Sequence, residues 1–386
     1  MENQKLDKKQ QLQLRRVLEV MLIGEFFGLH TLNSILTSFG IKSTNLYKIW
    51  KDFNFHQIKR LTIDLSIDYF KEAMEKLGNQ SDSTWSRSEV TIIIDDSIFK
   101  MWLKNMPQGD SYAKFFSGQI KRTVYGFRVT LIGINIGKDF HPLYFQIVPK
   151  KGDTKKVALN LLKKVRGIFL ELSEKQGFSY PNLYLSVDSG FTYDKLIAYC
   201  ERHDIGFIGV PKKTNVFKFK DINMNLKTFI EEQFLPKEQA YKEDMQRKGA
   251  TEKPFVLRMK AHYKAQDREV ILLFFRLNGS NKVTVIFCSD LEVMKKTLRR
   301  RFFQRTKIEL FFRFLKETLK IQKSKSERYG DFVKKLSLCI LKAVFCLRLQ
   351  KFFRKKRKFK GWSFYKIRQH IIYQEVDKTI LTDLIY

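Results

Sequence analysis

A change of hydrophobic periodicity at Val90 constrains the fold of this chain more than any other feature. From Val90 to Pro211, apolar segments with strand character alternate with amphipathic segments at helical spacing. Three strands, a helix, a strand, a helix and a strand are predicted, which indicates an α/β fold with a mixed sheet and flanking helices. The segments are, in order, "VTIIIDDSIF", "VYGFRVTLIGINIG", "HPLYFQIVP", a helix from Thr154 to Lys175, "LYLSVDSG", "TYDKLIAYCERHD" and "IGFIGVP".

The chain carries a large excess of positive charge, with 73 Lys and Arg residues against 40 Asp and Glu residues, a formal net charge of +33. Cationic surfaces bind phosphate backbones by releasing condensed counterions, so double-stranded DNA or another nucleic acid is the expected partner. A basic surface that is merely solvated is the alternative. Two basic clusters stand out, Arg299–Arg301 and "FFRKKRKFK" from Phe352, and aromatic residues between cations favour stacking on unpaired bases.

The first 85 residues are predicted to be helical, with "GIKST" as a turn between two short helical segments. This arrangement is similar to a helix-turn-helix, whose second helix enters the major groove. Tyr47, Lys48 and Lys51 are the residues expected to face DNA, although any small helical bundle has such loops.

Several classes of protein are disfavoured by the sequence. Four cysteines occur without a CxxC pair or a zinc-ligand spacing, so we expect buried thiols rather than a zinc site or a disulfide framework. The longest apolar segment begins at Leu336 and is interrupted by Lys342 and Arg348, which predicts a buried helix and no membrane span. Because the N-terminal residues lack a secretory pattern, a cytoplasmic protein is expected, associated with the nucleoid when bound to DNA.

Carboxylates follow two of the predicted strands. Asp95 and Asp96 end the apolar run "TIII", and Asp188 ends the strand in "LYLSVDSG". Ligand sites in α/β sheets gather at such strand ends, although an Asp in this position is also a common turn former. Successive strand residues face opposite sides of a sheet, so only one residue of the pair Asp95 and Asp96 is expected to face a given site.

A third carboxylate lies in the predicted helix "RRRFFQRTKIELFFRFLKETLK". At about 100° per residue, Phe302, Arg305, Glu309 and Lys316 fall within an arc of about 60°. Ile308, Phe311, Phe314 and Leu315 lie on roughly the opposite side, which is the expected core face. The alternative is a solvated face on which Arg305 and Glu309 form an ordinary i, i+4 ion pair.

These residues resemble the bacterial insertion-sequence transposases of the DDE type, in the branch marked by a Y-R-E-K signature. The spacing of that signature, Tyr-x2-Arg-x3-Glu-x6-Lys, is met by Phe302, Arg305, Glu309 and Lys316, with Phe in place of Tyr. "IIIDDS" and "SVDSGF" resemble the segments around the two catalytic Asp residues. Because a hydroxyl residue follows the first Asp in the family, the resemblance favours Asp96, which precedes Ser97, with Asp95 as the alternative.

The resemblance implies an RNase H-like catalytic domain that cleaves DNA and transfers strands. Asp96, Asp188 and Glu309 are expected to be catalytic and to bind Mg²⁺ or Mn²⁺, with two ions per site, and Phe302, Arg305 and Lys316 are expected to contact DNA. The partners would be transposon-end and target DNA and a second copy of the chain, as a homodimer on DNA. Two other functions remain open, a catalytically inactive transposase-derived DNA-binding protein and another RNase H-like nuclease.

The predicted organisation combines these assignments along the chain. The regions are 1–85, a helical DNA-binding domain; 86–214, the first part of the catalytic domain; 215–293, a β-rich insertion with a hairpin around "NGSN"; 294–330, the end of the catalytic domain with the Glu309 helix; and 331–386, a basic helical C-terminal region.

Overall fold

A computed structural model describes residues 53–78, 90–101, 111–117, 121–137, 139–176, 183–249, 251, 254–277, 280–323 and 329–355. The chain divides into two compact units, each formed by separate stretches of sequence. The first comprises Met1–Glu72, Ile98–Phe127 and Phe311–Tyr386, and the second comprises Ala73–Ser97 and Arg128–Leu310. The proposed helix-turn-helix and the residues beyond Lys355 lie outside the described residues.

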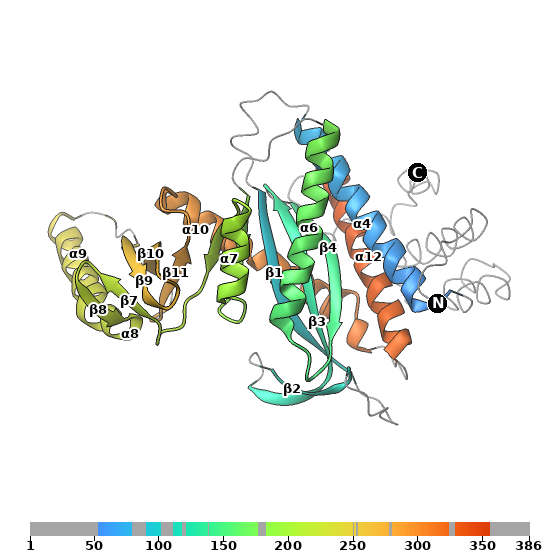
Figure 1. The fold of residues 1–386 in the computed structure, drawn as a ribbon, viewed down its shortest axis with the longest axis horizontal. Coiled ribbons are helices and arrows are strands. Elements are labelled where there is room, and N and C mark those ends of the chain that lie inside the picture. Colours follow the sequence, from blue (N-terminus) through green and yellow to red (C-terminus); the bar gives the residue numbers. More distant parts are fainter. Residues whose placement is uncertain are drawn as a thin grey trace. The chain divides into compact units, whose positions relative to one another are not determined.

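The second unit contains most of a large sheet and its covering helices (Figure 1). Its strands are β1 (Val90–Lys100) and β3 (Arg122–Ile136), which both continue into the first unit, β4 (Asp139–Val148), β5 (Tyr184–Ser186), β6 (Gly206–Gly209), β7 (Val216–Phe219), β8 (Ile222–Asn225), β9 (Val256–Tyr263), β10 (Arg268–Arg276) and β11 (Val283–Cys288). Its helical segments are α6 (Thr154–Gln176), α7 (Asp194–Arg202), α8 (Leu226–Phe229), η1 (Ile230–Phe234), α9 (Leu235–Arg247), η2 (Lys264–Gln266), α10 (Lys295–Gln304) and most of α11 (Thr306–Arg313).

The sheet is mixed and runs in the order β4-β3-β1-β5-β6-β11-β10-β9-β7-β8 within this unit. β1, β5 and β6 are parallel neighbours, whereas β3 with β4 and the strands from β6 to β8 pair antiparallel. Apart from β2, which the sequence did not predict, the element order from β1 to β6 is the predicted one. The predicted α/β fold with a mixed sheet and flanking helices is therefore confirmed.

Burial explains why the central strands are apolar on both sides. β1 is buried from Val90 to Asp95, and β5 is buried throughout, as is typical of parallel strands covered on both faces. In α6, the buried residues Ala158, Leu161, Leu162 and Val165 follow helical spacing and form one apolar stripe. The apolar strands and the apolar stripe of α6 thus both contribute to the core.

The insertion after β6 extends the sheet. The hairpin predicted around "NGSN" is formed by β10 and β11, which pair from Ile271↔Cys288 to Arg276↔Val283. Its core is aromatic: the rings of Phe219 and Phe229 stack with their centroids 4.1 Å apart. A partly buried ion pair joins α9 to β10, where Nε of Arg276 donates to both carboxylate oxygens of Glu238, at 3.0 and 2.8 Å.

The first unit is built around two long helices. Oγ1 of Thr62 donates to the carbonyl of Ser337 at 3.3 Å and joins α4 to α12, and the rings of Phe127 and Phe332 stack at 4.1 Å. The apolar segment is buried from Leu336 to Val344, including Lys342, which confirms the predicted buried helix. The elements are α4 (Phe55–Gly78), which ends in the second unit, β2 (Ala113–Ser117), η3 (Phe314–Thr318), η4 (Ile321–Lys323) and α12 (Tyr329–Lys355).

The other sequence expectations that the structure bears on concern thiols and membranes. All four cysteines are buried and free, as predicted: Cys200, Cys288, Cys339 and Cys346. None of the helices in the described ranges combines the length and apolarity that crossing a bilayer requires.

Candidate active site

The register between β1 and β5 places Asp95 and Asp188 in equivalent positions. Ile93 pairs with Ser186 in parallel, and each Asp follows its strand residue by two positions. Residues two apart point to the same face, and paired residues of adjacent strands point the same way about 4.8 Å apart. The two carboxylates therefore extend from the same face of the sheet, side by side.

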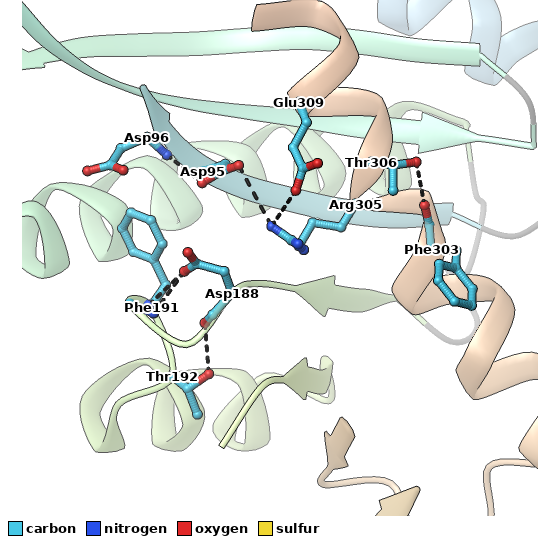
Figure 2. Close-up of polar contacts among 10 residues, drawn as sticks. Asp95, Asp96, Asp188, Phe191, Thr192, Phe303, Arg305, Thr306 and Glu309 are labelled. Atoms are coloured by element: carbon cyan, nitrogen blue, oxygen red, sulfur yellow. Dashed lines mark hydrogen bonds and ion pairs between the residues drawn. The ribbon is translucent and has the colours of Figure 1, made fainter. Parts of the chain in front are cut away.

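Asp96 points elsewhere. Its Oδ2 lies 3.7 Å from Nε of Arg128 on β3, and its backbone N–H donates to Oδ1 of Asp95 at 2.8 Å. The side chain of Asp96 is 36% exposed, whereas that of Asp95 is 12% exposed. Figure 2 shows the Asp96 carboxylate directed away from Asp95 and Asp188. The structure thus brings Asp95, and not Asp96, together with Asp188.

The electrostatics of Asp95 reflect this position. Burial is the main cause that raises its pKa from 3.8 to about 8, and the negative charge of Asp188 contributes in the same direction. The nearby guanidinium of Arg305 and the backbone N–H of Asp96 act in the opposite sense and only partly offset the shift. Because Arg305 offsets these effects only in part, a further cation would stabilise the ionised form of Asp95.

The loop after β5 fixes Asp188. Its Oδ1 accepts hydrogen bonds from the backbone N–H groups of Gly190 at 2.9 Å and Phe191 at 3.2 Å. Its carbonyl accepts from Oγ1 of Thr192 at 2.9 Å. The residues that follow Asp188 form this Asx-type turn. Asp188 therefore both stabilises the turn and lies at the end of the strand, beside Asp95.

Glu309 is connected to Asp95 through Arg305. Nη1 of Arg305 lies 2.9 Å from Oε1 of Glu309 and 3.8 Å from Oδ2 of Asp95 (Figure 2). The Arg305 side chain is mostly buried, and its Nε has no hydrogen-bond partner among the residues that the structure describes. The guanidinium therefore bridges two of the three carboxylates and occupies the place between them.

A break between α10 and α11 sets the position of Arg305. The helix stops at Gln304 and restarts at Thr306, and two carbonyls at the end of α10 accept side-chain hydrogen bonds there. Nδ2 of Asn135, on β3, donates to the carbonyl of Gln304 at 2.9 Å, and Oγ1 of Thr306 donates to the carbonyl of Phe303 at 2.8 Å. Asn135 is completely buried, so this contact ties the break to the sheet.

The break changes two expectations that assumed one continuous helix. Phe302 does not share an exposed face with Glu309; it is buried in a core cluster with Tyr184, Ile208 and Leu298. Its ring is therefore part of the core and is not available to DNA in this conformation. Lys316 belongs to η3 of the first unit, where its Nζ lies 5.3 Å from the ring centroid of Phe99.

Arg301 has a structural place that the sequence did not indicate. It was grouped with Arg299 and Arg300 as a DNA-tracking cluster, but it is buried, with its guanidinium 3.7 Å from the ring centroid of Tyr184. Its Nη1 also contacts the carbonyl of Val90 at 3.3 Å. Arg301 therefore fastens α10 to the strands that lead to Asp95 and Asp188.

The donor set is chemically suited to a hard divalent cation, but the carboxylates are not assembled as a ligand group. Carboxylate oxygens are the ligands that Mg²⁺ and Mn²⁺ favour. In the part of the chain that the structure describes, no three His, Cys, Asp or Glu side chains are grouped closely enough to hold a metal ion. Arg305 supplies the positive charge between Asp95 and Glu309 instead.

Asp95 and Asp188 thus follow two adjacent parallel strands of a mixed sheet, and Glu309 lies on the helix α11. The sequence matches the family described as "Transposase DDE domain" over residues 89–345, more than half of the chain. The chain therefore belongs to the DDE transposase family, whose members act on DNA.

Two further comparisons add little to this assignment. No curated protein matches the chain. Among solved structures, the chain is similar to the NurA nuclease from Sulfolobus solfataricus, with 12% identity, a TM-score of 0.22, and coverage of 80% of this chain and 95% of that one. With so low a TM-score, this likeness carries no weight here.

Proposed function

We propose that this chain is an insertion-sequence transposase of the Y-R-E-K branch, which cleaves transposon-end DNA and joins it to a target. Asp95, Asp188 and Glu309 are its catalytic carboxylates. The observation that carries this assignment is the shared register of Asp95 and Asp188 on β1 and β5, with Arg305 linking Asp95 to Glu309. We prefer Asp95 to Asp96, because the Asp96 carboxylate is turned toward Arg128.

Asp95, Asp188 and Glu309 would hold Mg²⁺ or Mn²⁺, as two ions by resemblance to the family. Bound metal would supply activation of the attacking oxygen and charge stabilisation of the leaving oxygen in phosphodiester cleavage and strand transfer. The buried position of Asp95 beside Asp188 supports this role, because both burial and the Asp188 charge disfavour its ionised form and a cation would stabilise that form.

Arg305 would change partners during the reaction. In the structure its guanidinium contacts Asp95 and Glu309, and a planar guanidinium is also a good bidentate ligand for phosphate. We propose that Arg305 leaves the carboxylates and holds a DNA phosphate when metal ions and DNA bind. Lys316 is proposed as a second phosphate contact, and Phe302 has a structural role.

The test uses a plasmid that carries the coding segment together with its flanking genomic DNA, so that the unknown transposon ends are present. Purified protein with Mg²⁺ should release the element and join it to a second plasmid, and EDTA should abolish both products. Asp95→Asn, Asp188→Asn and Glu309→Gln should each lose at least about 1,000-fold of the cleavage rate. Asp96→Asn, the matched control, should retain cleavage.

The outcomes separate the competing functions. Cleavage without joined product would support another RNase H-like nuclease, and DNA binding without cleavage by the unmodified chain would support a transposase-derived DNA-binding protein. Loss of cleavage in Asp96→Asn with full activity in Asp95→Asn would reverse our choice of first carboxylate. A homodimer is proposed for the complex with two ends, which mass measurement of the complex on DNA would check.

A further inference from the structure

The β2–β3 hairpin of the first unit is amphipathic, with an aromatic and basic outer face. Phe115 on β2 pairs with Val124 on β3, and both are buried. On the other side of the ribbon, Lys114 pairs with Tyr125, and Phe116 pairs with Thr123. We call these four residues, Lys114, Phe116, Thr123 and Tyr125, the outer hairpin face.

The outer hairpin face exposes a large apolar side chain that the core does not use. Phe116 is 64% exposed, and Tyr125 is 38% exposed. Isolated exposed apolar residues are common, but Phe116 lies in the same strand face as a lysine and an exposed tyrosine. An exposed phenyl ring next to cationic and aromatic groups suits a planar, negatively charged partner.

All the charged side chains of the hairpin are positive. Residues 111–127 contain Lys114, Lys121 and Arg122 and no Asp or Glu. Lys121 and Arg122 are exposed at the start of β3, and Nζ of Lys114 lies 5.1 Å from the ring centroid of Tyr125. Aromatic rings between cations are the combination that binds unpaired nucleotides, because bases stack on the rings while phosphates meet the cations.

The hairpin is anchored firmly enough to present this face. The ring of Tyr112 stacks on that of Tyr125 with centroids 6.1 Å apart, and its hydroxyl donates to the carbonyl of Met101 at 2.9 Å. At Gly126, β3 approaches the β1 backbone so closely that a Cβ atom would lie 2.2 Å from the carbonyl oxygen of Phe99. The base of the hairpin is thus held against β1.

We propose that the outer hairpin face binds unpaired bases of DNA, with the Phe116 ring stacking on a base and Lys114 and Arg122 contacting the adjoining phosphates. This inference rests on DNA being the substrate, as proposed above. Unpaired bases arise wherever the duplex is opened or distorted, so the hairpin gives the protein a preference for such DNA over a regular duplex.

The test compares two DNA probes by fluorescence anisotropy at one salt concentration, a duplex with a short single-stranded gap and the same duplex without it. The full chain should bind the gapped probe more tightly. Phe116→Ala should weaken binding to the gapped probe about ten-fold and to the regular duplex less than about two-fold, because stacking acts only on unpaired bases. Phe116→Trp should preserve the preference for the gapped probe. Lys114→Gln should weaken the binding of both probes equally.

The matched control is Ile222→Ala, which removes an equally exposed apolar side chain (62%) from β8 and should change neither affinity. The inference is overturned if Phe116→Ala leaves the gapped-probe affinity within about two-fold, weakens both probes equally, or changes the oligomeric state instead. Unmodified protein that binds neither probe would count against the proposed function itself. Binding of both probes without an effect of Phe116→Ala would remove only the role of the hairpin.

Discussion

Replacing Asp95 by Asn should stabilise the metal-free protein, although the same change should abolish cleavage. The side chain is 12% exposed, and burial together with the Asp188 charge raises its pKa from 3.8 to about 8. At pH 7, folding must therefore overcome the cost of either protonating or burying this carboxylate. Asn keeps the shape and an acceptor for the backbone N–H of Asp96 but carries no charge.

The magnitude follows from proton linkage. The folded-state pKa lies above the unfolded-state pKa, so the carboxyl costs nothing below pH 4 and costs progressively more until the pH passes about 8. Between 3.8 and 7 this amounts to at most about 4 kcal/mol. Loss of the 3.8 Å ion pair with Arg305 opposes the gain, so we expect a net stabilisation of about 1–3 kcal/mol at pH 7.

The measurement is chemical unfolding in EDTA at pH 7 and again near pH 4, where the gain should disappear. Asp96→Asn is the control, because its partly exposed side chain should change stability by less than about 0.5 kcal/mol. The reasoning would be refuted if Asp95→Asn were no more stable than the unmodified chain at pH 7. It would also be refuted if Asp96→Asn were the stabilised variant.

Three further changes test other parts of the structure by the same unfolding measurement. Arg301→Met should destabilise the protein by about 1–3 kcal/mol, because it removes a buried group that holds Tyr184 and the β1 backbone, whereas exposed Arg300→Met should cost less than about 0.5 kcal/mol. Alanine at Glu238, at Arg276 and at both should reveal a coupling of about 1–3 kcal/mol; additive effects would argue against a partly buried ion pair. Gly167→Ala should stabilise α6 by about 0.5–1 kcal/mol, since a Cβ atom there meets no other atom within 4 Å, and a loss would indicate an unseen contact.

The fold was predictable from periodicity, because strand and helix patterns each repeat over many residues. Except for β2, the order from β1 to β6 and the hairpin of β10 and β11 follow from local sequence. The β2–β3 hairpin was missed, although "AKFF" alternates between exposed and buried residues. Four residues are too few for a period-two pattern to stand out without its pairing partner.

The choice between Asp95 and Asp96 was not predictable from the sequence. Thr91, Ile92, Ile93 and Ile94 are all buried, so the strand has no polar side that would reveal which residue faces the site. Only the register between β1 and β5 shows which Asp lies beside Asp188. Because these two strands are far apart in the sequence, their register cannot be predicted from either strand alone.

The burial of Phe302 was missed for a related reason. Neither Gly nor Pro marks the break between α10 and α11, so a continuous helix was the natural expectation. The contact that accommodates the break comes from Asn135, 169 residues earlier in the chain. A lone Asn within the apolar strand "LIGINIG" was the available clue, because a buried amide requires a polar partner.

The attachment of the insertion to β6 has a consequence for how far the chain can be shortened. β6 is the last strand of the RNase H-like order, and β11 covers its outer side through Phe287↔Gly209 and Cys288↔Ile208. Phe207 and Ile208 are fully buried. In a chain without the insertion, β6 would be an edge strand with unpaired backbone N–H and C=O groups, which can pair with the strands of other chains. By pairing with β6, the strands of the insertion therefore prevent self-association through this edge.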